Sequence, residues 1–257
     1  MNKLLKFNSP RTLRWSMLLL GAFSLTTTIK AQKIDFDMTG RRSEEVTMNG
    51  FTSWQVGQLG YGASATTTVG RACVTVKNST GGYQLRSSWY KAGINSDKLI
   101  NDGIHHDGSP QRSTSITVQV SGLSNGTHSL QAYHNNCDGL NGASITVSVN
   151  GRKVTTVNPS NRAASTAKAA KSYVTFTGSS ATIVYSSNTD FFINSLEFDV
   201  ADANALATSP YPSDNDLHAN ADGGRISLRW TPARNGANSQ VLYWGTNKNA
   251  VANGTSA

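Results

Sequence analysis

Eight short segments of this chain alternate apolar and polar residues, and this alternation constrains the fold more than any other feature. The segments are 34–38, 72–76, 115–120, 128–133, 143–149, 173–176, 181–185 and 192–200. A period of two places successive side chains on opposite faces of a β-strand, so each segment predicts a strand with one packed and one solvated face. We therefore expect an all-β fold, an antiparallel jelly-roll β-sandwich.

The connections between these segments carry turn residues. Asn150-Gly151 follows one alternating segment and precedes another, and both residues of a tight hairpin turn must take positive φ, which Asn and Gly tolerate. The Ala-rich stretch 161–171 is compatible with a helix, but we expect a loop with one helical turn. Trp54 is expected to pack inside the sandwich.

Residues 1–32 have the three-part layout of a cleaved signal peptide: a basic region, the apolar stretch 17–25, and a small, polar end. The apolar stretch is shorter than the about 20 residues of a membrane-spanning helix, so a membrane anchor is the weaker alternative. We expect a protein that is secreted, periplasmic or on the cell surface, with no membrane contact after cleavage. Cys73 and Cys137 would then form either a disulfide or two separate buried thiols.

The predicted signal accounts for most of the positive charge. The full chain has a formal charge of +8, and its first 32 residues hold five basic residues and no acid, which leaves +3 for the remainder. That remainder has no dense run of Lys and Arg, so we expect no nucleic-acid partner. A weak preference for acidic polymers is compatible with this charge.

The composition divides the remainder into three parts. Residues 33–202 hold the predicted sandwich, and residues 203–215 form a linker in which two prolines bracket Tyr211. Residues 216–257 contain only two further strand patterns, and so few strands cannot close a sandwich. We expect a partial immunoglobulin or fibronectin-III-like β unit, either truncated or packed on the first domain, in a monomeric protein.

Candidate glycan-binding residues lie where predicted strands end in polar loops. Aromatic rings cover the apolar face of a sugar, while amides, acids and Arg hydrogen-bond its hydroxyl groups. The candidates are Trp89, Tyr90, Tyr133, His134, Asn135, Asn136, Asp138 and Arg162. Aromatic residues at strand ends are equally common in cores. The forked guanidinium of Arg162 would suit uronate or sulfate groups.

Two groups of residues could hold a metal ion. Four acids on the terminal strand segments offer the oxygen ligands that calcium takes, although a solvated acidic edge is the alternative. These acids are Asp35, Asp37, Glu197 and Asp199. His105 and His106 are adjacent, and neighbouring side chains of an extended chain point in opposite directions. We favour a polar turn at 107–108 over a metal site there.

Three segments of the predicted sandwich resemble malectin-like and galactose-binding-like jelly rolls that serve as carbohydrate-binding modules. Segments 33–37 and 194–200 resemble the paired terminal strands of these modules. Segment 126–136 resembles their inner strand, and 145–151 resembles their strand that ends in Val-Asn-Gly. The resemblance implies a polysaccharide partner and, often, a structural calcium ion.

The C-terminal part carries a second resemblance. Segments 209–212, 226–232 and 241–251 are similar to the start of a fibronectin-III-like module of secreted multidomain enzymes of the Bacteroidota. In those enzymes the module often follows a jelly roll and precedes a polysaccharide-degrading domain, frequently a β-helix lyase. The similarity implies that this chain is the non-catalytic front end of such an enzyme.

Three hypotheses follow for the function. The first is a secreted polysaccharide-binding module, the non-catalytic N-terminal part of a polysaccharide lyase or hydrolase. The second is that the jelly roll is itself a small lyase, with His134 or Tyr133 as the base and Arg162 neutralising a uronate. The third is a structural or adhesive spacer at the cell surface. No hydrolase elbow, HExxH motif or phosphate loop occurs in the sequence.

Overall fold

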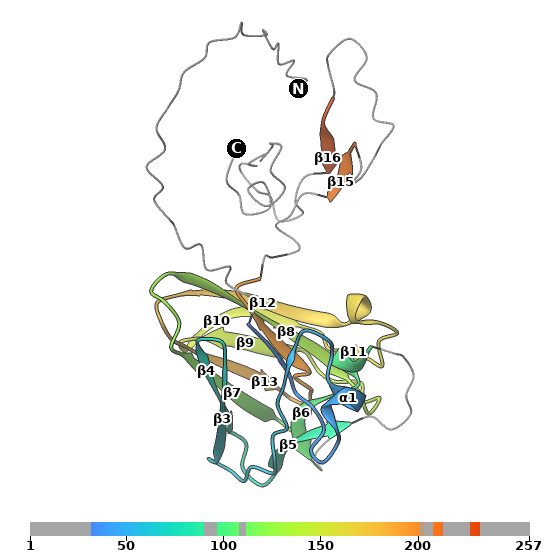
Figure 1. The fold of residues 1–257 in the computed structure, drawn as a ribbon. Helices are drawn as coiled ribbons and strands as arrows, with labels where there is room; N and C mark the ends of the chain where they lie inside the picture. The colour runs from blue at the N-terminus through green and yellow to red at the C-terminus, as the bar shows by residue number, and fades with distance from the viewer. Residues whose placement is uncertain are drawn as a thin grey trace, which may run out of the picture.

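The computed structural model describes residues 32–89, 97–107, 112–200, 202, 208–212 and 227–231. Most of its strands form two six-stranded sheets that pack face to face (Figure 1). This arrangement confirms the predicted all-β sandwich of jelly-roll type. In the described part of the chain, no helix has the length and apolar character that crossing a bilayer requires.

The first sheet has the strand order β11-β8-β14-β1-β2, and β12 also pairs with β8. Its strands are β1 (Gln32–Asp35), β2 (Thr52–Ser53), β8 (Thr127–Asn136), β11 (Ser160–Asn161), β12 (Ala170–Thr177) and β14 (Ser195–Phe198). The central strands β8, β14 and β1 are antiparallel neighbours, whereas β2 and β11 join parallel to β1 and β8. The predicted terminal segments therefore pair at the centre of this sheet.

The second sheet has the order β10-β9-β13-β7-β4-β3. Its strands are β3 (Ser64–Val69), β4 (Ala72–Asn78), β7 (Thr114–Ser121), β9 (Ile145–Val149), β10 (Arg152–Val157) and β13 (Ala181–Ser187). All of its pairings are antiparallel. Asn150 and Gly151 have φ values of 49° and 80° in the turn from β9 to β10, which confirms the predicted hairpin.

Smaller elements complete the described structure. They are the hairpin of β5 (Gln84–Trp89) and β6 (Asp102–Asp107), the pair of β15 (Thr208–Tyr211) and β16 (Arg229–Thr231), the helix α1 (Ser43–Val46), and the 3-10 turns η1 (Lys98–Ile100) and η2 (Thr166–Lys168). The turn η2 is the predicted helical turn within 161–171. Ile104 of β6 forms an isolated antiparallel bridge with Ile193, which lies in the segment before β14.

The core lies between the two sheets because alternate residues of each strand point inward. Ile34 and Phe36 of the first sheet and Val74 and Val76 of the second belong to one buried apolar cluster. Trp54 packs against Phe36 at 5.4 Å between ring centroids, as predicted. Burial of such aromatic and aliphatic surface is the main stabilising contribution to a fold of this kind.

One end of the sandwich collects most of the connections of interest, and we call it the loop end. There β8 and β13 end and β14 begins, because Ser195 pairs with Tyr133 and the β13–β14 connection bonds to both sheets. Segments 137–144, 158–162 and 188–194 meet at this end. Strand β1 also ends there, with Asp35 opposite Ser195.

Some predictions concern residues outside this part of the chain or differ from it. The predicted signal, residues 1–32, lies outside the described residues except for Gln32. Nearly all of 213–257 also lies outside them. β15 lies within the predicted linker and pairs with β16 of the predicted incomplete module. Cys73 and Cys137 are both free thiols, Cys73 half-buried and Cys137 buried, so the disulfide alternative is not realised.

Candidate functional site

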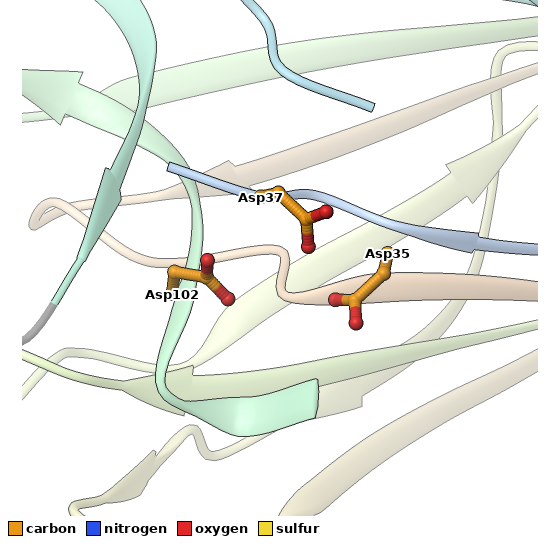
Figure 2. A group of neighbouring side chains, drawn as sticks. All are labelled: Asp35, Asp37 and Asp102. Carbon is orange, nitrogen blue, oxygen red and sulfur yellow. The ribbon is translucent and has the colours of Figure 1, made fainter. Parts of the chain in front are cut away.

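Three buried aspartates form a cluster at the loop end (Figure 2). Asp35 is the last residue of β1, Asp37 follows two residues later, and Asp102 begins β6. Because Ile34 and Phe36 point into the core, alternation turns Asp35 and Asp37 to the opposite face of the first sheet. One ligand atom from each aspartate lies within 4.8 Å of the others, and all three residues are 0% exposed.

Each carboxylate of this cluster is bonded through one oxygen and bare at the other. Oδ2 of Asp35 accepts the Met48 amide at 2.7 Å, and Oδ2 of Asp102 accepts the Met38 amide at 2.9 Å. Oδ2 of Asp37 accepts two hydroxyl groups, from Thr47 and Ser53. The Oδ1 atoms of all three aspartates are buried with no hydrogen-bond partner. Buried polar atoms without partners are costly, so this arrangement needs a cation or protons.

The pKa values of all three aspartates are raised. Burial, followed by the charge of Asp37, raises the pKa of Asp35 to about 8. Burial also raises the pKa of Asp37, and burial together with the charge of Asp35 raises that of Asp102 well above its ordinary value. A hard divalent cation such as Ca²⁺ takes carboxylate oxygens and would replace these protons. The residues present therefore fit a calcium ion.

The structure changes half of the predicted calcium set. It brings Asp35 and Asp37 together, but it adds Asp102 and places Glu197 and Asp199 elsewhere. The Nζ atom of Lys33 lies 2.7 Å from Glu197, and Nδ1 of His128 lies 2.9 Å from Asp199. The reason is the antiparallel register: Asp35 lies opposite Ser195, so the later residues of β14 run away from the cluster. Nothing in the local sequence identifies Asp102, which is 65 positions from Asp37 in the chain.

Four of the predicted sugar contacts are buried in the structure. Tyr133 is 6% exposed, and His134, Asn135 and Asn136 are between 0% and 2% exposed. Asn135 is a structural hub: Nδ2 donates to the Ile100 carbonyl, while Oδ1 accepts the Ser160 hydroxyl and the Ala163 amide. The side chains of these residues are therefore part of the packing at the loop end.

Burial also removes the two bases of the lyase hypothesis. Both ring nitrogens of His134 are bonded, to the Phe192 carbonyl and the Ser172 hydroxyl, and burial lowers its pKa to about 4. Burial, with the charge of Glu197, raises the pKa of Tyr133. A base that takes a proton from a polysaccharide must reach it, and neither side chain does.

Asp138 and Arg162 are the exposed members of the predicted set among the side chains that the structure describes. Nη2 of Arg162 donates to the Asp138 carbonyl at 2.9 Å, and Nδ2 of Asn161 donates to the Gly139 carbonyl at 3.0 Å. Gly139 has a φ of 87°, in the left-handed region that favours glycine, and a Cβ atom there would lie 2.7 Å from the Arg162 guanidinium. The two loops thus meet at the loop end.

The predicted stacking residues are only partly described. Trp89 is the last residue of β5, and its backbone pairs with Asp102 in the hairpin register. Its side chain and the whole of Tyr90 lie outside the described part of the structure. The backbone therefore brings Trp89 beside the aspartate cluster.

A hollow that the sequence reasoning missed opens on the second sheet at the loop end. Its volume is about 480 Å³, and serine, threonine, glycine and asparagine line it throughout. The lining residues are Ser79, Thr80, Gly81, Ser113, Thr114, Ser115, Ser144, Thr146, Ser186, Ser187 and Asn188. None of these carries a charge or an aromatic ring. The sequence feature that could have indicated this hollow is the frequent Ser and Thr at the outward positions of β7, β9 and β13.

Three of these hydroxyl side chains form a row on adjacent strands. Ser115 pairs with Ser186, and Ser186 pairs with Thr146, so the row crosses β7, β13 and β9. Neighbouring strands are about 4.8 Å apart, which spaces the hydroxyl groups regularly. Other lining residues position this row. For example, the Thr80 hydroxyl accepts a hydrogen bond from the Ser115 amide at 2.6 Å.

The adjacent histidines lie in a strand, and Gly108 of the predicted turn lies outside the described residues. His105 and His106 belong to β6. Nδ1 of His105 bonds to Asp190 at 2.7 Å, and Nε2 of His106 bonds to Asn78 at 3.0 Å. Their separate partners agree with side chains that point in opposite directions, and neither belongs to a three-residue metal cluster among the described residues.

Several solved structures show a partial likeness to this chain. A family 35 carbohydrate binding module from an environmental isolate is 17% identical, with a TM-score of 0.31, and the match covers 56% of this chain and 91% of that one. The family 35 module from Clostridium thermocellum is 14% identical, with a TM-score of 0.31 and coverage of 54% and 99%. The CBM35 from Cellvibrio japonicus Abf62 is 16% identical, with a TM-score of 0.32 and coverage of 50% and 94%.

Likenesses with TM-scores this far below 0.5 assign neither a family nor a ligand to the present chain. No protein-family model and no curated protein matches the sequence.

Proposed function

We propose that this chain is a calcium-stabilised glycan-binding module of an exported protein. The observation that carries the proposal is the uncharged, hydroxyl-lined hollow at the loop end, where Ser115, Ser186 and Thr146 present a row of hydroxyl groups. Hydroxyl and amide groups in a concavity of this size are suited to hydrogen-bond the hydroxyl groups of one or two sugar residues.

The exposed polar groups near the hollow support the same reading. Asp138 and Arg162 lie on loops of the loop end, and the segment after Asn188 joins the hollow to those loops through the bond between Ala143 and Thr189. Arg162 offers charge-assisted bonds to an acidic sugar. The proposed ligand is accordingly a polysaccharide, and the module acts as a monomer.

Calcium enters the proposal through the three bare Oδ1 atoms of Asp35, Asp37 and Asp102. A bound ion would neutralise the cluster and join the end of β1 to the start of β6. The protein's own residues would supply at least one oxygen from each aspartate. The ion is proposed to stabilise the fold and takes no part in chemistry.

The wider context of the proposal follows the sequence resemblances. Residues 1–32 are proposed to be removed during export, and the chain is proposed to be the non-catalytic N-terminal part of a polysaccharide lyase. The burial of His134 and Tyr133 supports a non-catalytic module. Release of unsaturated uronate products by the purified chain, seen as ultraviolet absorbance, would contradict this part.

Native electrophoresis through gels that contain a single polysaccharide tests the binding proposal. The panel should include neutral galactan, mannan and xylan, and acidic pectate and alginate, with a polysaccharide-free gel as the reference. We expect retardation by at least one polysaccharide relative to a non-binding marker protein. Unchanged mobility in every gel, with calcium present, would overturn the proposal.

A further inference from the structure

The second sheet is free of acidic residues. Its six strands contain no aspartate or glutamate, although the whole chain has 15 acidic residues. The charged residues of these strands are Lys77, Arg152 and Lys153. All three are exposed. This sheet is therefore the cationic side of the sandwich.

The strand register places two of these cations on one row of the outer face. Lys77 pairs with Thr117, Thr117 with Val184, Val184 with Ser148, and Ser148 with Lys153. The row points outward, because the residues before and after its members on β4, β7, β13 and β9 are buried. Four strand spacings separate the two lysine backbones, which amounts to about 19 Å.

Neither lysine has an acidic partner. The ion pairs that the structure describes involve other residues, and no described carboxylate lies within 4.0 Å of Lys77 or Lys153. Two unpaired cations with hydroxyl groups between them are complementary to a ligand that carries both negative charges and hydroxyl groups.

This row continues the hollow. Ser115, Ser186 and Thr146 of the hollow lie two residues further along the same three strands. The Ser79 hydroxyl of the lining bonds to the Thr117 hydroxyl of the row at 2.8 Å. A chain molecule that entered the hollow would therefore lie beside the row on the same face.

We infer that the outer face of the second sheet binds a linear polysaccharide bearing carboxylate or sulfate groups, with Lys77 and Lys153 pairing with acidic groups on separate sugar residues. The inference rests on the proposed function and names the class of glycan. A polysaccharide fits better than a nucleic acid, because two lysines about 19 Å apart would neutralise few of the closely spaced phosphates of a nucleic acid.

The test compares the wild-type chain with the double variant Lys77→Gln/Lys153→Gln, using sodium alginate and pectate as acidic probes and galactan as the neutral probe. The matched control is Lys168→Gln/Lys171→Gln, which removes the same charge from exposed positions in η2 and β12. We expect the double variant to bind the acidic probes about tenfold more weakly, whereas the control keeps wild-type affinity. Raising the salt concentration should weaken wild-type binding more than that of the double variant.

Several outcomes separate this inference from the proposed function. Wild-type affinity of the double variant for alginate and pectate would overturn the inference, and so would binding to galactan alone, yet both would leave glycan binding intact. Duplex DNA is run as a further probe, and tighter binding to DNA than to every polysaccharide would overturn the inferred ligand class. Binding to neutral mannan or xylan but to no acidic probe would overturn the inference alone, whereas binding to none of the five polysaccharides removes the proposed function and the inference with it. Thermal unfolding checks that both variants are folded, which the exposure of all four lysines favours.

Discussion

The backbone amide of Met38 donates a hydrogen bond to Oδ2 of Asp102, although the two residues are 64 positions apart in the sequence. This bond joins the segment after β1 to the first residue of β6. Asp102 thus uses Oδ2 for a hydrogen bond with the backbone, while its Oδ1 atom, like those of the other two aspartates, has no hydrogen-bond partner. The stability of this junction is the most direct readout of the proposed ion.

Calcium should stabilise the wild-type chain and leave Asp102→Asn unaffected. An ion that binds only the folded state at a hundredfold excess over its Kd adds about 2.7 kcal/mol to the free energy of unfolding. Asp138→Asn, which changes an exposed acid outside the cluster, is the control and should respond like the wild type. The measurement is thermal unfolding in EDTA and in CaCl₂, and an equal calcium shift in Asp102→Asn would contradict the assigned ligand.

The calcium effect should also depend on pH. Without calcium the folded-state pKa of Asp35 is about 8, above the ordinary value of 3.8, so the folded state binds more protons than the unfolded state between these values. The contribution of Asp35 to the free energy of unfolding is therefore full below about pH 4 and is lost as pH rises towards 8. Calcium binding requires the ionised form, so its stabilisation should grow over the same range.

Asp35→Asn serves as the reference for this pH effect, because the titrating groups outside the aspartate cluster cancel when the two proteins are compared. Urea unfolding in EDTA at pH 5 and pH 8 gives the two free energies. We expect the wild type to lose stability relative to Asp35→Asn between these pH values. A constant difference would show that Asp35 keeps an ordinary pKa.

Ser186→Ala should weaken glycan binding without affecting the fold. The Ser186 hydroxyl lies in the middle of the row in the hollow, and loss of one hydrogen bond to a ligand costs about 1 kcal/mol, or roughly fivefold in Kd. Thr175→Ala changes an exposed position of β12 in the first sheet, away from the hollow, and is the control. Affinity electrophoresis would measure the Kd of both variants. An equal loss of affinity in the two variants would show that the ligand does not bind in the hollow.

Asn135→Ala and Asp138→Ala should separate a structural residue from an exposed one. The buried Asn135 amide bonds to Ile100, Ser160 and Ala163, so its loss leaves buried groups unpaired and should cost about 2 to 4 kcal/mol. Asp138 is exposed, and its replacement should cost less than about 0.5 kcal/mol. Chemical denaturation measures both values. Similar small losses would show that the Asn135 network is dispensable.

The alternation of apolar and polar residues was sufficient to predict the sandwich. It identified the inward positions of the strands, such as Ile34 and Phe36, because the pleat has the same period as the pattern. The Asn150-Gly151 hairpin was equally local, since its turn depends on residues that accept positive φ. Features of this kind are set by neighbours in the sequence.

The candidate site depends on contacts between distant segments, and there the sequence was a weaker guide. Asp35 and Asp37 were identified because both lie on the first terminal strand segment, whereas Asp102 is brought to them by the β5–β6 hairpin. Asn135 was predicted to meet a ligand, but loop packing buries it. Period-two patterns say which residues share a face, and they do not say which loops cover that face.

The pairing of β1 with β14 has a consequence for how the module is attached to other domains. Gln32 lies opposite Phe198, so the chain enters and leaves the sandwich at adjacent points, remote from the end where Asp35 meets Ser195 (Figure 1). A domain joined after the sandwich would be tethered on that side, where the proposed removal of residues 1–32 also leaves the N-terminus. The loop end and its hollow would then face away from the attachment point, free to approach an insoluble polymer.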